Sequence, residues 1–361
     1  MVENSFYFFI ENFFDERIYL VSFVLSAFLC YFFWRSRFLL KNNYYNKIQK
    51  IHFKETSRLG GVSLYLSLLI STFIFELQEL HTIILFYLPI FIVATIEDVN
   101  HNVKPWIRFI VILISCSAYF VFFLKNLIIP FEIFQLFSKD LYNYLFAIFC
   151  LSLFSATVVN GSNMIDGANG LCSFYFLSVI FIIILILLKE EIYVNINSYV
   201  TLFFAITGFL IFNFPKGRIF LGDNGAYLLG FLTFMLSANY LKNQHNSISS
   251  FVVISFFFYP IFEVIFSMIR KIVTKKNPFE ADDLHLHLLV YKIISSSRKP
   301  DEFSNALSTV FLSIIWLIPN LIILIFYNYY GAPIIFLLNF IILYFCLYIS
   351  ISVYLKRNNE I

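Results

Sequence analysis

Five polar clusters interrupt an otherwise apolar chain, and they contain the side chains that bind metal ions and phosphates. They lie at residues 57–61, 97–98, 160–170, 213–225 and 282–287. Carboxylate and amide oxygens suit Mg²⁺, which takes few protein ligands and binds substrate phosphates as well. Glycines let a backbone come close to a ligand, and histidines near arginine and lysine suit a lid over phosphate groups. Together these residue types predict a site for a metal–diphosphate substrate.

Each cluster has a plain structural explanation when it is taken alone. Paired acids at the end of an apolar run, such as Glu97 and Asp98, commonly form a solvated helix terminus. A Gly-Asp-Asn-Gly sequence favours a turn, and Gly60-Gly61 indicates close packing of two helices. The pair His285 and His287 alone favours a surface position. The prediction of a site therefore rests on the clusters occurring together.

The composition indicates that these clusters belong to an integral membrane protein. Of 361 residues, 60% are hydrophobic and 13% are charged, with a mean hydropathy of +0.82, whereas soluble domains are about 25% charged. The net charge of +3 is too small to indicate nucleic-acid binding. The five cysteines form no CxxC motif or Cys/His cluster, so we expect buried thiols and neither disulfides nor a zinc site.

Long apolar runs predict the elements that carry the clusters. A spanning helix needs about 20 mostly apolar residues, and eleven segments are candidates: 18–36, 60–78, 80–96, 107–125, 141–159, 171–189, 198–213, 225–242, 248–270, 305–327 and 333–355. Strands of a membrane barrel would be half as long and would alternate. We therefore predict an all-α, polytopic membrane protein with about 11 transmembrane helices, although ten or twelve stay open. Residues 1–361 are expected to form one membrane domain.

Basic residues in the loops predict the orientation. If loop 35–58 is cytoplasmic, 20 of the 25 lysines and arginines fall on that side, in agreement with the positive-inside rule. The N-terminus then lies outside, the C-terminus lies in the cytoplasm, and all five polar clusters share the cytoplasmic face. Acidic residues precede the first apolar run, so we expect no cleaved signal peptide.

The clusters resemble, in order and spacing, the polyprenyl-phosphate N-acetylhexosamine-1-phosphate transferases of the MraY/WecA type, glycosyltransferase family 4. The resemblance covers residues 43–292. Its most specific parts are 160–171, close to N-x-x-N-x-x-D-G-x-N-G-L, and 218–223, R-I-F-L-G-D. Four positions depart from the family pattern: Glu97 replaces an aspartate, Ser57 a proline, Leu288 a third histidine, and Asn224 a serine or alanine.

The resemblance implies a fold, a reaction and a place in the cell. The fold would have ten or eleven helices with a cytoplasmic active site. The enzyme would move a hexosamine-1-phosphate from a UDP-N-acetyl sugar to undecaprenyl or another polyprenyl phosphate, releasing UMP. This is a first membrane step of O-antigen, lipopolysaccharide or cell-wall glycan synthesis in the bacterial cytoplasmic (inner) membrane. Membrane lipids surround the protein, and a homodimer is an open possibility by analogy with some relatives.

The resemblance also implies a role for each matching residue. Catalytic roles fall on four acids: Glu97, Asp98, Asp166 and Asp223. Mg²⁺, or Mn²⁺ in its place, would be held by Asp223 and Asn163. Substrate binding would need a basic residue for phosphate, two amides for uridine and a two-histidine lid: Arg108, Asn169, Asn213, His285 and His287.

Several alternatives stay open from the sequence. Asp98 is expected to position the acceptor or to remove a residual proton, because a phosphate monoester is already largely dianionic at pH 7; a covalent intermediate on Asp98 is the rival mechanism. A cation- or proton-coupled transporter also carries acids within a membrane, but those acids should lie near the bilayer midplane. A third alternative is that the protein is an inactive relative of the family that serves as a binding scaffold. The presence of all the acids argues against this alternative.

Overall fold

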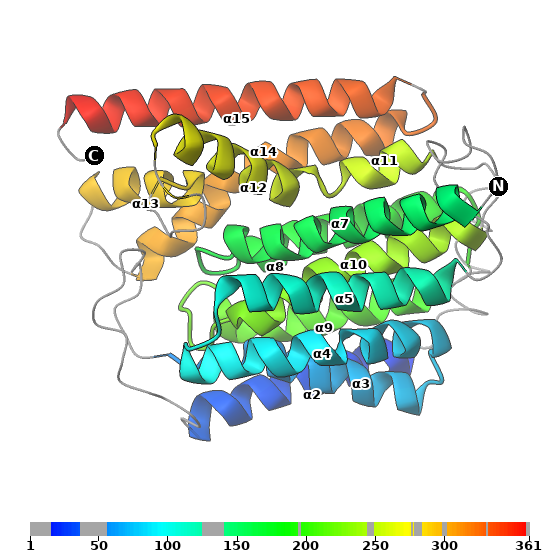
Figure 1. Ribbon diagram of the computed structural model, residues 1–361. Helices are drawn as coiled ribbons and strands as arrows, with labels where there is room; N and C mark the ends of the chain where they lie inside the picture. Colours follow the sequence, from blue (N-terminus) through cyan, green and yellow to red (C-terminus); the bar gives the residue numbers. More distant parts are fainter. Residues whose placement is uncertain are drawn as a thin grey trace.

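The protein folds into a bundle of helices that run side by side (Figure 1). The computed structural model describes residues 16–36, 56–124, 141–193, 196–243, 249–275, 277, 284–297, 302–329 and 331–358. Within these ranges every regular element is an α-helix, as predicted. The helices are α2 (Glu16–Ser36), α3 (Gly60–Ile74), α4 (Gln78–Asn100), α5 (Pro105–Phe123), α7 (Leu141–Ile165), α8 (Leu171–Lys189), α9 (Ile196–Asn213), α10 (Gly222–Asn243), α11 (Ser250–Ser255), α12 (Phe258–Val273), α13 (Leu286–Ser297), α14 (Glu302–Phe326) and α15 (Ala332–Arg357).

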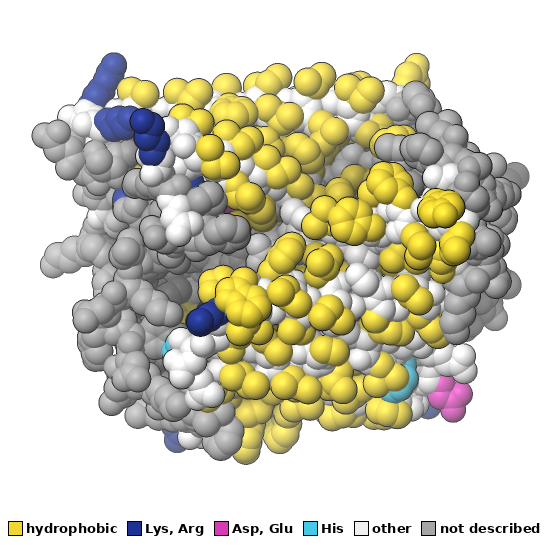
Figure 2. Space-filling view, in the orientation of Figure 1, with side chains coloured by type: hydrophobic (Ala, Val, Ile, Leu, Met, Phe, Trp, Pro, Cys, Tyr) yellow, Lys and Arg dark blue, Asp and Glu magenta, His cyan; other side chains and the backbone are white. Residues whose placement is uncertain are grey.

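Eight of the described helices are long and apolar enough to cross a membrane: α2, α4, α5, α7, α8, α9, α14 and α15. Hydrophobic side chains cover the middle of the face in Figure 2, and many lysine and arginine side chains lie toward its left end. The chain is therefore a multi-pass, all-α membrane protein. The predicted count of about 11 transmembrane helices and the predicted orientation of the termini stay predictions.

Helix α10 shows why one predicted span is less apolar than the others. Nearly all of its side chains from residue 222 to 241 are buried, because it packs against α3, α4 and α7. A helix surrounded by protein can hold small and polar residues where helices meet, and Thr233 and Ser237 are buried there. A Cβ on Gly61 of α3 would collide with the backbone of Gly225. The predicted close packing at the glycine pair is thus confirmed.

The predicted span 248–270 is not one continuous helix, because it breaks at residues 256 and 257 into α11 and α12. Proline has no N–H and its ring clashes with the carbonyl four residues earlier, so Pro260 cannot continue a helix through Phe256 undisturbed. The carbonyl of Phe256 accepts a hydrogen bond from the Tyr175 hydroxyl instead. The break therefore has a local cause in the sequence and a partner in α8.

The chain between the predicted spans 248–270 and 305–327 contains a further helix, α13. Its buried residues Leu286, Leu289 and Val290 recur at helical spacing, and the helix packs on α14 and α15. Two other elements also have boundaries that differ from the prediction. Helix α4 continues to Asn100 and so includes Glu97 and Asp98, and α7 continues to Ile165, so the first half of the 160–170 cluster is helical.

Candidate active site

Two polar clusters, 57–61 and 213–225, meet where the chain before α3 pairs with the chain before α10. The Phe220 N–H donates to the Ser57 carbonyl at 2.8 Å, and the Gly60 N–H donates to the Phe220 carbonyl at 3.0 Å. The Gly61 N–H donates to the Leu221 carbonyl at 2.9 Å. These hydrogen bonds fix the segment around residue 58 beside the start of α10, although the two lie far apart in the sequence.

Asp98 at the end of α4 caps the N-terminus of α10. Its Oδ1 accepts the Asp223 N–H and its Oδ2 accepts the Asn224 N–H, each at 2.9 Å. The first N–H groups of a helix have no partner within the helix and carry partial positive charge, so a carboxylate is favourable there. Gly222 precedes them with φ +75°, and a Cβ on it would lie 2.6 Å from Asp98 Oδ2. Asp98 thus holds the backbone that carries Asp223.

Asn224 reinforces this junction. Its amide nitrogen donates to Thr95 Oγ1 at 2.7 Å, and the Tyr87 hydroxyl donates to its Oδ1 at 2.9 Å. Thr95 and Tyr87 both belong to α4. The asparagine that departs from the family pattern therefore ties α10 to α4 by side-chain hydrogen bonds.

Two arginines bind the carboxylate of Asp223. Arg58 Nη2 lies 3.0 Å from Asp223 Oδ1, and Arg58 Nε lies 3.3 Å from Asp98 Oδ1. Arg108 forms a hydrogen-bonded ion pair with Asp223 Oδ2 and lies 3.9 Å from Glu97 Oε1. Arg108 was predicted as a site residue, whereas Arg58 was missed. Its signal was its position in the polar cluster before the glycine pair, where it was counted only as a cytoplasmic basic residue.

Glu97 shapes the turn that brings Arg108 to the site. Its Oε2 accepts the Val103 N–H at 2.8 Å, and His101 takes a left-handed conformation with φ 55° at the end of α4. Helix α5 then begins at Pro105, which places Arg108 in its first turn. Glu97 therefore contributes both charge and backbone geometry.

The end of α7 brings Asn163 to the same face. Its amide nitrogen lies 3.4 Å from the Tyr227 hydroxyl, and Tyr227 follows Asp223 by four residues on α10. Residues four apart on a helix are neighbours on one face. The side chain of Asn163 thus reaches the face of α10 that Asp223 occupies, as the predicted shared role requires.

Asp166 lies in the turn after α7, and its side chain has no hydrogen bond to any described residue. It interacts electrostatically with Arg58, Asp223 and Asp98. Burial, with smaller contributions from Asp223 and Asp98, raises the pKa of Asp166 to about 7, while Arg58 lowers it. A buried carboxylate beside two other acids is costly to the fold even with Arg58 nearby, so this position is optimised for something other than stability.

We expect Asp166→Asn to raise thermal stability and to reduce turnover. The folded-state pKa of about 7 exceeds the unfolded value of about 3.9, so ionisation penalises the folded state as pH rises from about 4 to about 7. The midpoint of thermal unfolding, measured in detergent with chelator, should rise by roughly 2–5 °C at pH 8. The gain should vanish near pH 4. Glu191→Gln, an exposed acid, is the control, and a stabilisation independent of pH would contradict the expectation.

In this structure, the two asparagine side chains that were predicted to hold uridine donate hydrogen bonds to backbone carbonyls. Asn213 donates from Nδ2 to the Ile219 carbonyl, and Asn169 donates from Nδ2 to the Pro215 carbonyl, both at 2.9 Å. The Asn169 Oδ1 atom is buried without a hydrogen-bond partner among the described residues. The side chain of Asn169 thus holds the backbone at Pro215 through Nδ2 and keeps Oδ1 as an acceptor that no described residue uses. Its role in binding uridine stays a prediction.

Helix α14 holds Asn169 from the other side. The backbone N–H of Asn169 donates to Asn305 Oδ1 at 2.6 Å, and the Thr309 hydroxyl donates to the Asn169 carbonyl at 2.8 Å. Neither Asn305 nor Thr309 was predicted. Both lie at the polar beginning of an apolar helix, so their position in the sequence carried little signal.

The two predicted lid histidines lie beside the 166–170 turn. The ring of His287 lies directly against Gly167, and its ring centroid is 5.7 Å from that of His285 with 15° between the planes. Burial, and then the neighbouring His285, lower the pKa of His287 to about 3, although Glu263 raises it. His287 is therefore neutral at pH 7.

The donor set fits a divalent cation. Four carboxylates, from Glu97, Asp98, Asp166 and Asp223, surround two guanidinium groups, which leaves a formal charge of −2 when all are ionised. No group of three or more His, Cys, Asp or Glu side chains is arranged to hold a metal in the part of the chain that the structure describes. Mg²⁺ needs few protein ligands, so Asp223 with the amide oxygen of Asn163 would be enough if substrate phosphates and water complete the shell.

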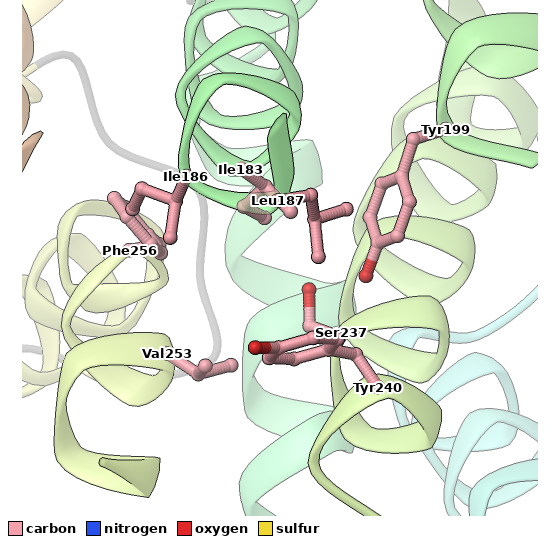
Figure 3. A pocket seen from close by; sticks show the side chains of 8 residues that line it. All are labelled: Ile183, Ile186, Leu187, Tyr199, Ser237, Tyr240, Val253 and Phe256. Carbon is pink, nitrogen blue, oxygen red and sulfur yellow. The ribbon is translucent and has the colours of Figure 1, made fainter. Parts of the chain in front are cut away.

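A separate hollow at the far ends of α8 and α10 has no role in this site (Figure 3). Its volume of about 10 Å³ holds roughly a single water molecule. Leu187, Tyr199, Ser237 and Phe256 are among its mostly apolar lining residues. Ser237 lies 15 residues beyond Gly222 on α10, which corresponds to about 22 Å along the helix axis.

Sequence comparison agrees with the residues assembled at this site. The sequence model described as glycosyl transferase family 4 matches residues 80–240. Over this segment the chain is similar to glycosyl transferase family 4. The family segment contains Glu97, Asp98, Arg108, the 160–170 cluster and Asp223, whereas Arg58 and the two histidines lie outside it. The predicted resemblance to this family is thereby confirmed over the segment that carries most of the site.

Named relatives in the family share one reaction type. An undecaprenyl-phosphate alpha-N-acetylglucosaminyl 1-phosphate transferase of Thermotoga maritima is 27% identical over 271 residues, 74% of this chain and 78% of the relative. A probable undecaprenyl-phosphate N-acetylglucosaminyl 1-phosphate transferase of Bacillus subtilis is 28% identical over 130 residues, 36% of each chain. A decaprenyl-phosphate N-acetylglucosaminephosphotransferase of Mycobacterium leprae is 26% identical over 164 residues, 40% of this chain and 41% of the relative.

Proposed function

We propose that this protein transfers an N-acetylhexosamine-1-phosphate from a UDP-sugar to undecaprenyl or another polyprenyl phosphate and releases UMP. The observation that carries the proposal is the group of four acids and two arginines at one end of a membrane bundle. The names of the relatives, which combine polyprenyl phosphates with N-acetylglucosamine, support the same acceptor and donor class. UDP-N-acetylglucosamine is the first donor to test.

In the proposed reaction, an oxygen of the lipid phosphate attacks the sugar-linked phosphorus of the donor. A new P–O–P bond forms, the bond from that phosphorus to the bridging oxygen breaks, and UMP leaves with the electron pair. Phosphoryl transfer depends mainly on positioning and charge neutralisation. Bound Mg²⁺ would supply charge neutralisation at the diphosphate oxygens.

The protein's own residues would bind the phosphate groups and hold the start of α10 in place. Arg58 and Arg108 pair with Asp223 in this structure, and phosphate oxygens would compete for the same guanidinium groups. Asp223 would then be available to hold Mg²⁺. Asp98 keeps the α10 N-terminus in place through its two hydrogen bonds. Turnover needs no general base in this scheme, because the acceptor phosphate is largely dianionic at pH 7.

We also propose that the site faces the cytoplasm of a bacterium, in its inner membrane. The helix ends that carry the site, at Asn100, Ile165 and Gly222, lie at the same end of the bundle as the last residues of α2 and α15 (Figure 1). Those two helices carry basic residues in their last turns, which favours the cytoplasmic side. The product would start O-antigen, lipopolysaccharide or cell-wall glycan synthesis.

The test is turnover by the purified, detergent-solubilised protein. Undecaprenyl phosphate, Mg²⁺ and a panel of UDP-N-acetyl sugars are supplied, and UMP release is followed with and without chelator. We expect release with at least one sugar, lost on chelation and restored by added Mg²⁺ or Mn²⁺. No release from folded protein with any sugar would contradict the proposal. A sugar-independent, ion-driven flux in reconstituted vesicles would instead favour a transporter.

A further inference from the structure

A buried carboxylate in the middle of an apolar run is unexplained by the site described above. Glu263 of α12 is 1% exposed, and both of its oxygens are engaged. Oε1 lies 3.1 Å from His285 Nδ1, and Oε2 accepts the Tyr344 hydroxyl at 2.6 Å. Residues from three parts of the chain thus meet at one carboxylate: α12, the segment just before α13, and α15. All three lie outside residues 80–240, which match the family model.

Burying the Glu263 carboxylate in these surroundings costs folding free energy, which indicates that the residue has a functional role. The Phe262 and Tyr344 rings lie 4.8 Å apart beside it, in a contact between α12 and α15 that is mainly aromatic around Glu263. A charged group in such surroundings is tolerated only when it is paired and hydrogen-bonded. Ionisable residues within membrane helices mark function by default. A purely structural contact between the helices could be made with apolar residues alone.

The contacts of Glu263 lead to the reaction site through the histidines. His285 stacks on His287, with 5.7 Å between ring centroids, and His287 lies against Gly167. Gly167 directly follows Asp166, which interacts with Arg58 and Asp223. A shift of the His285 ring would therefore be passed to the turn that carries Asp166.

The hydrogen bond at Nδ1 decides what the other nitrogen of His285 does. A carboxylate accepts hydrogen bonds only, so the Nδ1 atom that faces Glu263 must carry the hydrogen. In a neutral ring this leaves Nε2 as an acceptor, and in a charged ring it leaves Nε2 as a donor. Tyr344, by occupying Oε2, stops the carboxylate from rotating away. The pair thereby fixes both the plane of the ring and its hydrogen position.

We propose that Glu263 and Tyr344 are positioning residues that fix His285, the lid over the diphosphate of the nucleotide sugar, with its hydrogen on Nδ1. The proposal rests on the proposed function for the ligand that His285 meets. The hydrogen position itself is independent of the reaction. Helix α15 thus contributes to catalysis through the Tyr344 hydroxyl.

The first test reads the histidine directly by ¹⁵N NMR of protein with ¹⁵N-labelled histidine in nanodiscs, without substrate. His285→Asn identifies the His285 signals. We expect the wild-type Nδ1 of His285 to be protonated and Glu263→Gln to shift the hydrogen toward Nε2. Tyr344→Phe should broaden the signals because the carboxylate is less restrained. Unchanged His285 signals in Glu263→Gln would overturn the proposal, whatever the donor sugar proves to be.

The second test measures UMP release from the same proteins. Glu263→Gln should lose about 10- to 100-fold in turnover, as other residues that orient a functional histidine do, and Glu263→Asp should recover part of it. Tyr344→Phe should lose less. The matched controls are Glu79→Gln, at the other end of the bundle, and Tyr259→Phe, whose buried hydroxyl has no partner among the described residues. Equal turnover in Glu263→Gln and Glu79→Gln would overturn a role of Glu263 in catalysis. If the wild type released no UMP but showed the expected NMR shifts, the result would count against the proposed function alone.

Discussion

Asp223→Ala is expected to reduce UMP release by about 10³-fold or more, the largest effect of any single change in this site. Asp223 combines three properties that no other described residue shares. It lies in the first turn of the buried helix α10, it binds both arginines, and it lies on the α10 face reached by Asn163. Its loss would remove the proposed metal ligand and the carboxylate that both guanidinium groups share.

A second variant separates the metal role from folding. Asp223→Asn keeps the shape and one oxygen acceptor for the arginines, so the protein should fold, yet its affinity for Mg²⁺ should fall. Mg²⁺ should raise the unfolding midpoint of the wild type, because a ligand that binds only the folded state stabilises it. That rise should be absent in Asp223→Asn. Asn239→Ala, a change near the other end of α10, is the matched control and should behave as the wild type.

Two results would count against this assignment. One is turnover of Asp223→Asn above about a tenth of the wild-type rate with an unchanged dependence on Mg²⁺. The other is a loss of turnover that Arg58→Ala reproduces while Mg²⁺ still stabilises Asp223→Asn. In the second case Asp223 would serve only to hold the arginines, and the metal ligands would lie elsewhere.

The sequence was sufficient for the helices and for most acids of the site, because each carries its own local signal. A run of about 20 apolar residues predicts a span, and a carboxylate at the end of such a run is unusual. Arg58 carries no such signal, since a basic residue before a helix is equally well explained by orientation. Its role depends on contacts with Asp98 and Asp223, which only the folded chain brings near.

Two features that the sequence analysis missed, the helix break near Pro260 and the buried acid Glu263, did have signals in the sequence. In both cases the long apolar run 248–270 outweighed the signal. The break between α11 and α12 follows from Pro260, yet the apolar run 248–270 is long enough to hide it, and prolines inside α4 and α14 do not break those helices. Glu263 lies within the same run, where an acid should have been read as functional. Its partner Tyr344 had no signal, because a tyrosine in an apolar helix is common at a membrane.

Asp98→Asn should lower turnover by about 100-fold and should weaken Mg²⁺ binding as well. The carboxylate accepts two N–H groups from the first turn of α10 and also meets Arg58. An asparagine offers one acceptor oxygen and turns an NH₂ group toward the other N–H. Each hydrogen bond to a charged group contributes about 1.5–3 kcal/mol. The start of α10, and Asp223 with it, should therefore be less well placed.

The same variant distinguishes positioning from covalent catalysis. A nucleophilic Asp98 would have to leave α10 and Arg58 to attack phosphorus, and its asparagine variant would then have no turnover while Mg²⁺ binding stayed normal. If Asp98 acts through α10, Tyr87→Phe and Thr95→Val, which loosen Asn224 at the same helix end, should show smaller losses together with weaker Mg²⁺ binding. Turnover as a function of Mg²⁺ concentration across the three variants decides between the two, because only a positioning role links the loss of rate to the loss of metal affinity.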